Sequence, residues 1–372
     1  MPDTCPAGNA EATIPVGGCI EVENAIIPAA HSADVCCSMM ATFFKSDLST
    51  KELIDNLVSS THFGFCSEER VAEIRPTVRE RIVNFCEGNS LLEDLTFNAV
   101  KDFASQGDGN HFAFLGEVNP SQKMINEIVE DGRYFCDLSA GATYKVLVTH
   151  HGSRSLGAKL YKKGVSLAEK FCKRYAKGIP KAAQWIPYDS EDGEEYWKAL
   201  KKVRLWTEAS HKEIADKFIG RIRCSYKCRL FNEHNFVWKR DNLFYHGKGA
   251  TPAWDLCGLP SIGLIPLSMC DPVLFVSGRN NDRYLSFAPH GAGRNYSRTS
   301  LTKQYEADAQ QKVLDEISDK IDLRWYSGKP DFSETPVAYK SADVIARQIE
   351  EFELADVLAE IQPLGCVMAG SK

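Results

Sequence analysis

Two long stretches of the chain place apolar residues at the spacing of an amphipathic helix. Residues 155–177 and residues 194–222 each repeat an apolar side chain every three or four positions, which puts these side chains on one helical face. We expect the apolar face of the second stretch to be core rather than a ligand site. The apolar positions are Leu156, Leu160, Leu167 and Phe171 in the first stretch, and Trp197, Leu200, Val203, Trp206, Ile214 and Phe218 in the second.

Shorter helices are predicted on both sides of these two. Residues 49–50, a serine and a threonine, can cap a helix that continues to about Val58, with Leu53, Ile54 and Leu57 on one face. Further helices are expected over residues 90–104, 121–131, 304–320 and 341–359.

Strands are predicted between these helices. Residues 12–28 alternate glycine turns with β-branched residues, Lys145–Thr149 is a short apolar strand that ends at His150, and residues 230–290 contain several short strands with Gly/Pro turns. Strands and helices mix without a regular β-α alternation, and neither a repeat nor a low-complexity linker divides the chain. The expected fold is therefore α+β, a single domain over residues 1–372 with mixed β-sheets packed with helices.

Composition places this domain among globular proteins. The 372 residues are 44% apolar and 25% charged, and the apolar runs are too short and broken to span a bilayer. The first residues, Met-Pro-Asp-Thr-Cys-Pro, have neither a basic nor an apolar signal region. Thirteen cysteines occur without paired C-x-x-C units, which disfavours a zinc ribbon. We expect a cytoplasmic protein, without membrane association, whose cysteines are mostly reduced and buried.

The charge distribution leaves two interpretations open. The net charge of −6 disfavours a general nucleic-acid coat, but residues 159–181 and 221–248 are basic, with Tyr161, Tyr175 and Trp238 among the aromatic residues interleaved there. Either basic run alone is best explained as the solvated face of a helix. Two such runs beside histidine-rich motifs favour an anionic polymer as partner.

The nine histidines include a subset in compact polar or glycine-rich contexts, whereas His62 and His211 are expected at the surface. Asp34 and Cys37, in D-V-C-C, add a carboxylate and a thiol to these histidines. Mixed oxygen, nitrogen and sulfur donors suit Mn²⁺, Zn²⁺, Co²⁺ or Fe²⁺ better than Ca²⁺ or Mg²⁺, and a thiolate can bridge two ions. The candidate ligands are Asp34, Cys37, His111, His150 and His234.

The stretch S-F-A-P-H-G-A-G-R-N-Y-S-R at 286–298 contains the remaining candidate chemistry. His290 precedes Gly-Ala-Gly, and Arg294 and Arg298 follow. Glycines allow a ligand close to the backbone, arginines suit phosphate oxygens, and a neutral imidazole can act as a nucleophile. A histidine aimed at a phosphoryl group is one interpretation; a glycine-rich turn with solvated side chains is the other.

Several motifs in order resemble the RtcB family of RNA ligases, from Met1 to about Gly370. The motifs are N-A-I-I-P-A-A-H-S-A-D-V-C-C-S-M at 24–39, G-D-G-N-H-F at 107–112, T-H-H-G-S-R-S-L-G at 149–157, H-N at 234–235, K-G-A-T at 248–251, H-G-A-G-R-x-x-S-R at 290–298 and A-Y-K at 338–340.

This resemblance implies an enzyme with a central metal and nucleotide cleft. It implies that the enzyme joins RNA 3′-phosphate or 2′,3′-cyclic phosphate ends to 5′-hydroxyl ends, with GTP and two Mn²⁺ ions, in tRNA splicing or RNA repair. It implies that His290 takes the guanylate and passes it to the RNA 3′-phosphate, and that the five candidate ligands hold the metals; a monomer is expected. The other implied site residues are Asn110, Asn235, Ser268, Gly291, Ala292 and Gly293 for the nucleotide, and Arg294, Arg298, Arg154, Lys248 and Asp3 for phosphates and RNA.

The sequence departs from the family pattern near the nucleotide. Phe114 stands where the family usually has a glutamate, the loop P-L-S-M-C-D-P at 266–272 lacks two glycines, Met368 replaces a lysine, and Cys5 replaces a histidine. Phe114 can stack on a base but cannot accept hydrogen bonds from guanine. Three hypotheses follow: a divergent RNA ligase, a metal-dependent nucleotidyltransferase or enzyme that processes RNA 3′-phosphates, and a non-catalytic protein that binds RNA ends.

Overall fold

The structure, a computed structural model, describes residues 1–6, 14–64, 74, 76–254 and 262–371. Its largest sheet has the strand order β11-β12-β15-β4-β5-β3-β7, with β14 added beside β15. Only the β14–β15 pair of this sheet is parallel. The strands are β3 (Ser38–Phe44), β4 (Phe112–Val118), β5 (Tyr144–His151), β7 (Tyr226–Glu233), β11 (Ile262–Pro266), β12 (Val273–Gly278), β14 (Asp322–Trp325) and β15 (Ala355–Met368).

Smaller sheets extend the molecule beside this sheet. They have the strand orders β1-β9-β8, β10-β13 and β2-β6, and all their pairs are antiparallel. Their strands are β1 (Gly18–Glu23), β2 (Ala25–Ile26), β6 (Ile186–Pro187), β8 (Asn235–Arg240), β9 (Leu243–Lys248), β10 (Ala250–Pro252) and β13 (Phe287–Pro289).

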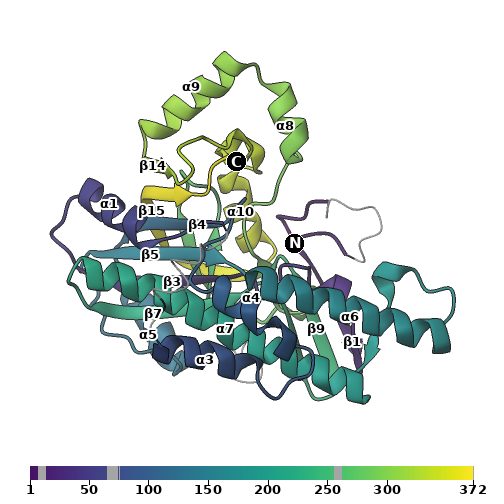
Figure 1. Ribbon diagram of the computed structural model, residues 1–372. Helices are drawn as coiled ribbons and strands as arrows, with labels where there is room; N and C mark the ends of the chain where they lie inside the picture. Colours follow the sequence, from purple (N-terminus) through teal and green to yellow (C-terminus); the bar gives the residue numbers. More distant parts are fainter. Residues whose placement is uncertain (7–13, 65–73, 75, 255–261, 372) are drawn as a thin grey trace.

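Helices surround the main sheet. In Figure 1, α6 and α7 lie in front of the strands with α3 and α4 packed beside them, and α8 and α9 arch away beyond β14. The helices are α1 (Thr50–Ser60), α3 (Pro76–Cys86), α4 (Thr96–Lys101), α5 (Gln122–Asp131), α6 (Arg154–Tyr175), α7 (Glu191–Arg221), α8 (Arg298–Gln304), α9 (Ala307–Ser318) and α10 (Ala342–Glu351). Short 3₁₀ turns occur at Pro28–Ala30, Glu93–Leu95, Lys181–Ala183, Asp282–Tyr284, Phe332–Glu334 and Pro336–Ala338.

The alternation of side chains along the central strands gives the sheet two buried faces. On β4, Ala113 and Leu115 pack with Phe218 of α7 on one face, whereas Phe114 packs with Met124 of α5 on the other. Each such large apolar side chain stabilises the fold by roughly 1.5–3 kcal/mol when fully buried. The sheet is therefore held rigid from both sides, and its strand ends can position a site.

Most predicted elements are present, and the mixed α+β class is confirmed. Ser49 caps α1 in a capping box with Glu52. The helix expected over 90–104 is reduced to a 3₁₀ turn and the six-residue α4, and α3 was not anticipated. Of the strand region 12–28, β1 and β2 are present, and residues 12 and 13 lie outside the described part. Within the described ranges, no helix is long and apolar enough to cross a membrane.

Two sequence expectations were wrong, whereas the one for the cysteines was met. The helix predicted over 341–359 ends at Glu351, because Ala355–Met368 pairs with β12 and β4 and continues as a strand. His211 is fully buried rather than exposed, since its ring stacks on His151 with the ring centroids 3.6 Å apart. The eleven described cysteines are free thiols and six of them are buried, in agreement with the expectation that most cysteines are reduced and buried.

Candidate active site

The five candidate ligands, from four separate parts of the chain, converge in one cluster. The Cys37 Sγ atom lies 3.4 Å from His111 Nε2 and 3.2 Å from His150 Nε2. Asp34 Oδ2 is 3.1 Å from His111 Nε2, and His234 Nε2 is 3.3 Å from His150 Nε2. Cys37, His111 and His150 are buried and form a group whose donor atoms could hold a metal ion.

Strand register explains this convergence. Met39 of β3 and Phe112 of β4 both pair with His150, near the end of β5. Cys37 and His111 immediately precede their strands, so both lie at the same end of the sheet as His150. The backbone N–H of His234 donates to the Cys37 carbonyl at 2.9 Å, which brings the end of β7 into the same cluster.

The protonation states fit metal ligands. Burial lowers the pKa of His150 and His234 well below the usual histidine value, so both imidazoles are neutral and can offer a lone pair. His150 Nδ1 lies 3.2 Å from the Asn110 carbonyl and can donate to it only as the tautomer that leaves Nε2 free. Burial, followed by the nearby Asp34 carboxylate, raises the pKa of the Cys37 thiol. A bound metal would displace that proton.

Small residues and an arginine fix the outer side of the cluster. A Cβ atom at Gly152 would lie 2.1 Å from Asp34 Oδ1, and one at Gly107, where φ is +93°, would lie 2.2 Å from the Arg154 guanidinium. Arg154 Nη1 is 3.0 Å from His111 Nδ1. Glycine at these two positions therefore makes room for a carboxylate and a guanidinium in contact with the same imidazole.

His290 lies next to this cluster and is held by a buried carboxylate. Its Nδ1 atom is 2.7 Å from Asp3 Oδ2, and its backbone N–H donates to the same oxygen at 3.2 Å. Asp3 is completely buried. The His290 ring packs against the His234 ring with centroids 4.9 Å apart. For a neutral imidazole, a carboxylate beside Nδ1 selects the tautomer that donates from Nδ1 and leaves the lone pair on Nε2, the form that a nucleophile needs.

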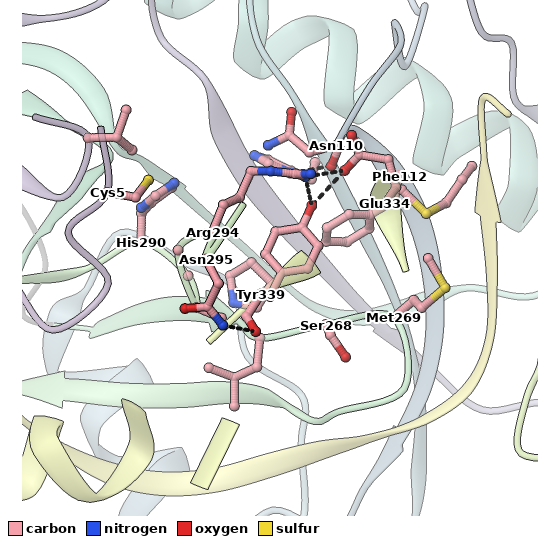
Figure 2. A pocket seen from close by; sticks show the side chains of 18 of the residues that line it. Cys5, Asn110, Phe112, Ser268, Met269, His290, Arg294, Asn295, Glu334 and Tyr339 are labelled. Carbon is pink, nitrogen blue, oxygen red and sulfur yellow. Dashed lines mark hydrogen bonds and ion pairs between the residues drawn. The ribbon is translucent and has the colours of Figure 1, made fainter. Parts of the chain in front are cut away.

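A cavity of about 520 Å³ opens beside His290. Figure 2 shows His290 and Cys5 at one side of it and Ser268, Met269 and Phe112 at the other. A Cβ atom at Gly293, where φ is +71°, would lie 1.9 Å from the Asp3 carbonyl oxygen, so the loop needs glycine there. The candidate residues that line the cavity are Asn110, His150, Ser268, His290, Gly291, Ala292, Gly293, Arg294 and Arg298.

The two arginines of the cavity share a buried carboxylate that the sequence analysis did not identify. Arg298 Nε donates to Glu334 Oε1 at 2.6 Å, and Arg294 Nη1 lies 3.4 Å from Glu334 Oε2. The Tyr339 hydroxyl also donates to Glu334, at 2.6 Å (Figure 2). The Glu334 side chain is only 1% exposed. The A-Y-K motif contains Tyr339, but no local pattern indicates which carboxylate the arginines meet.

The part of the cavity away from His290 is apolar. Among the described residues that line the cavity, Glu334 is the one carboxylate. Its oxygens already accept hydrogen bonds from Arg294, Arg298 and Tyr339. The edge of a base bound at this end would therefore meet aromatic and aliphatic side chains such as Phe114, and no free carboxylate would accept its hydrogen bonds. The apolar side chains that line it are Phe112, Phe114, Met269, Val273, Cys366 and Met368.

A second, more open cavity of about 470 Å³ lies on the outer side of the ligand cluster. It shares Asn110 and Arg298 with the first cavity and is also lined by Asp34, His111 and Arg154. The cluster is thus accessible from two directions, which suits a site where two substrates meet.

Two candidate residues occupy supporting positions instead of lining either cavity. Asn235 Nδ2 donates to the Asp34 carbonyl at 3.2 Å, and its Oδ1 accepts from the Gly249 N–H at 2.7 Å. Lys248 Nζ donates to the Ile14 carbonyl at 3.2 Å. Ser268 does line the first cavity, but its hydroxyl donates to the Asp271 carboxylate.

Comparisons with known proteins agree with this geometry. A family model described as tRNA-splicing ligase RtcB matches residues 1–369. The tRNA-splicing ligase RtcB of Thermococcus kodakarensis is 25% identical, over 97% of this chain and 86% of that protein. The RNA-splicing ligase RtcB of Escherichia coli is 22% identical, over 95% of this chain and 86% of that protein. The alignment with the Pyrococcus furiosus relative, 27% identical, covers 77% of this chain but 32% of that protein.

Proposed function

The chain belongs to the RtcB family, and from this premise we propose that it is an RNA ligase that joins RNA 3′-phosphate or 2′,3′-cyclic phosphate ends to 5′-hydroxyl ends. The proposed reaction uses GTP and Mn²⁺ and passes through a guanylate on His290. The observation that carries the proposal is the position of His290, fixed by Asp3, packed on the ligand His234 and open to a cavity.

In the first proposed step, His290 Nε2 attacks the α-phosphorus of GTP. A nitrogen–phosphorus bond forms, and the bond to pyrophosphate breaks. Asp3 keeps the Nδ1 proton in place and stabilises the positive charge that the imidazole gains on attack. Gly293, with its positive φ, keeps the loop against the Asp3 backbone and so holds His290 in position.

In the second proposed step, an oxygen of the RNA 3′-phosphate attacks the phosphorus bound to His290, and the imidazole leaves as a neutral group. The 5′-hydroxyl of the other RNA end then attacks the activated 3′-phosphate and GMP departs. A 2′,3′-cyclic phosphate is first opened by water to give the 3′-phosphate. The second cavity, beside Arg154 and Asp34, is where we place the RNA ends.

Arg294 and Arg298 support this assignment because they line the first cavity near His290. Glu334 holds both guanidinium groups, so their orientation is set before a nucleotide binds. The remaining N–H donors of the two guanidinium groups are the proposed contacts to phosphate oxygens.

Two Mn²⁺ ions are the proposed metals. The donor set of one thiolate, three imidazoles and one carboxylate fits this class of ion, and the neutral state of His150 and His234 supports it. When bound, the metals supply positive charge that offsets the charge of the phosphates. The ligands would be Asp34, Cys37, His111, His150 and His234.

A second candidate function is favoured by the apolar end of the first cavity. Without a free carboxylate there, stacking on the partly exposed Phe112 would hold any purine, so a nucleotidyltransferase or 3′-phosphate-processing enzyme with relaxed base preference also fits. The test is incubation with Mn²⁺ and each of four α-³²P-labelled nucleoside triphosphates, followed by a denaturing gel and a ligation assay.

We expect acid-labile label on the protein from GTP and sealing of 3′-phosphate to 5′-hydroxyl RNA. Label from several nucleotides without sealing would favour the second candidate. Absence of label with metal bound would favour a non-catalytic protein that binds RNA ends. His290→Ala is the matched control, since it removes the nucleophile at a partly exposed position and leaves the ligand cluster intact.

A further inference from the structure

The helix α6 concentrates positive charge on a chain that is negative overall. Its 22 residues include seven basic residues and one acidic residue, a net charge of +6, whereas the whole chain carries −6. The helix begins at Arg154, which contacts the ligand His111. From there it runs outward from the centre of the molecule (Figure 1). The charge therefore starts at the active site and leads away from it.

Four lysines of α6 form one exposed row, which we call the lysine stripe. They are separated by 3, 8 and 3 positions, so at 100° per residue they lie within an arc of about 80° along roughly 21 Å of helix. The buried residues of α6, such as Leu160 and Ala168, face the other side. The stripe consists of Lys159, Lys162, Lys170 and Lys173, all exposed.

Much of this charge is available to a ligand. Lys173 pairs with Glu169 at 2.8 Å, and Lys159 donates to Asn98 at 2.8 Å. Over the described residues, Lys162 and Lys170 form no ion pair with a carboxylate. The free ammonium groups of Lys162 and Lys170, flanked by Lys159 and Lys173, make a row of positive charge in which Glu169 is the one acidic residue of α6, and such a row attracts a polyanion.

Exposed aromatic rings lie at both ends of the lysine stripe. Phe97 of α4 is 72% exposed, and its neighbour Asn98 contacts Lys159. Tyr175, the last residue of α6, is 64% exposed, and the Arg174 guanidinium lies 5.1 Å from its ring centroid. Large aromatic side chains with exposed faces beside cations are platforms on which unpaired bases stack.

We propose that the lysine stripe, with Phe97 and Tyr175, binds a single-stranded stretch of the RNA whose end reacts in the active site. The proposal rests on the proposed function, which supplies an RNA end near Arg154. The phosphates would follow the lysines, and unpaired bases would stack on the two rings. Stacking favours a single strand over a duplex, because bases in a duplex are already stacked on one another.

The test measures RNA affinity by fluorescence anisotropy at several KCl concentrations. The probes are an unstructured 20-nucleotide RNA and a 5-nucleotide RNA, both with a 3′-phosphate. The stripe variant is K162Q/K170Q/K173Q, and the control K51Q/K123Q/K217Q removes the same charge from exposed positions on α1, α5 and α7. We expect the stripe variant to lose about tenfold or more in affinity for the long RNA. Its slope of log K against log[KCl] should fall by about 2, from three lost phosphate contacts at about 0.7 each.

The short RNA should bind the stripe variant within about twofold of wild type, because it cannot extend along α6. F97A/Y175A should weaken the long RNA while leaving the salt slope unchanged, since stacking releases no counterions. The proposal would be overturned if the control variant lost as much affinity for the long RNA as the stripe variant, or if the stripe variant bound it as tightly as wild type. It would also be overturned if wild type bound a blunt RNA duplex as tightly as the single strand. If wild type does not seal RNA but these affinity differences are observed, the proposed ligase function is wrong, whereas RNA binding by the lysine stripe is supported.

Discussion

At the residue scale, the contact between Asp3 and His290 sets the tautomer of the proposed nucleophile. A neutral histidine has two tautomers, and a carboxylate at Nδ1 selects the one with its lone pair on Nε2. Asp3 is fully buried and accepts from both the ring and the backbone of His290. Its charge would also stabilise the imidazolium formed during attack on phosphorus.

Asp3→Asn should slow nucleotide transfer to His290 by about 100-fold or more, the range typical of a lost acid–base partner. The amide preserves the size of the side chain but removes the negative charge. The measurement is the initial rate of covalent labelling under saturating Mn²⁺ and GTP. Bound metal should stay at the wild-type level, and a wild-type labelling rate would rule out the role given to Asp3.

The adjacent residues Cys36 and Cys37 offer a matched pair of variants for testing the cluster of proposed metal ligands. Cys37→Ala removes a donor that lies within 3.4 Å of two histidines, so we expect it to lower bound Mn²⁺ by at least one ion per chain. Cys36→Ala is the control, because that neighbouring buried thiol lies outside the cluster. Metal content is measured by mass spectrometry after equilibrium dialysis. Equal metal content in the two variants would reject a role for the Cys37 sulfur.

Residue types were easier to predict than their partners. The metal and nucleophile candidates stand out in the sequence because histidine, cysteine and arginine occur there beside glycine and asparagine. The Glu334 carboxylate and the burial of His211 were missed, because each depends on contacts between residues far apart in the chain. A single sequence contains the chemistry of a side chain but not the identity of what it touches.

At the element scale, local signals predicted helix starts well and strand identity less well. Ser49 and Ser121 cap α1 and α5 where a serine precedes an apolar periodicity. Ala355–Met368 was predicted as helix in its first part, yet it forms the longest strand of the sheet. Its conformation is set by pairing with β12 and β4, and such long-range hydrogen bonding leaves no local periodic signal.

The buried His211 joins α7 to β3 and β5, the strands beside the proposed metal ligands Cys37 and His150. Its Nε2 lies 3.1 Å from Ser38 Oγ on β3, and its Nδ1 lies 2.7 Å from Thr149 Oγ1 on β5. His211→Ala should lower the free energy of unfolding by about 2–4 kcal/mol, because it opens a cavity and leaves two buried hydroxyls without this partner. Urea denaturation measures the loss. Lys217→Ala, at an exposed site on the same helix, should change stability by no more than about 0.5 kcal/mol, and a similar loss in both variants would contradict this role.

At the scale of the whole molecule, the candidate active site is assembled from both ends of the chain. Lys340 Nζ donates to the Pro2 carbonyl at 2.9 Å and to the Thr4 carbonyl at 2.6 Å. These two carbonyls flank Asp3, which holds His290. A lysine near the C-terminal end of the fold therefore fixes the N-terminal segment that orients the proposed nucleophile. This long-range connection could not be predicted from the A-Y-K motif, although the motif drew attention to the position.

Lys340→Met should slow covalent labelling of His290 by about tenfold, because an apolar side chain of similar length leaves the N-terminal segment without its two hydrogen bonds. Metal content should be unchanged, since Lys340 does not contact the ligand cluster. The decisive measurement is a double-mutant cycle with Asp3→Asn. If Lys340 acts only by positioning Asp3, the double variant should label no more slowly than Asp3→Asn alone, because the two changes interrupt one connection. If the fold-decrease in labelling rate of the double variant equals the product of the two single-variant decreases, Lys340 instead acts on the site independently of Asp3.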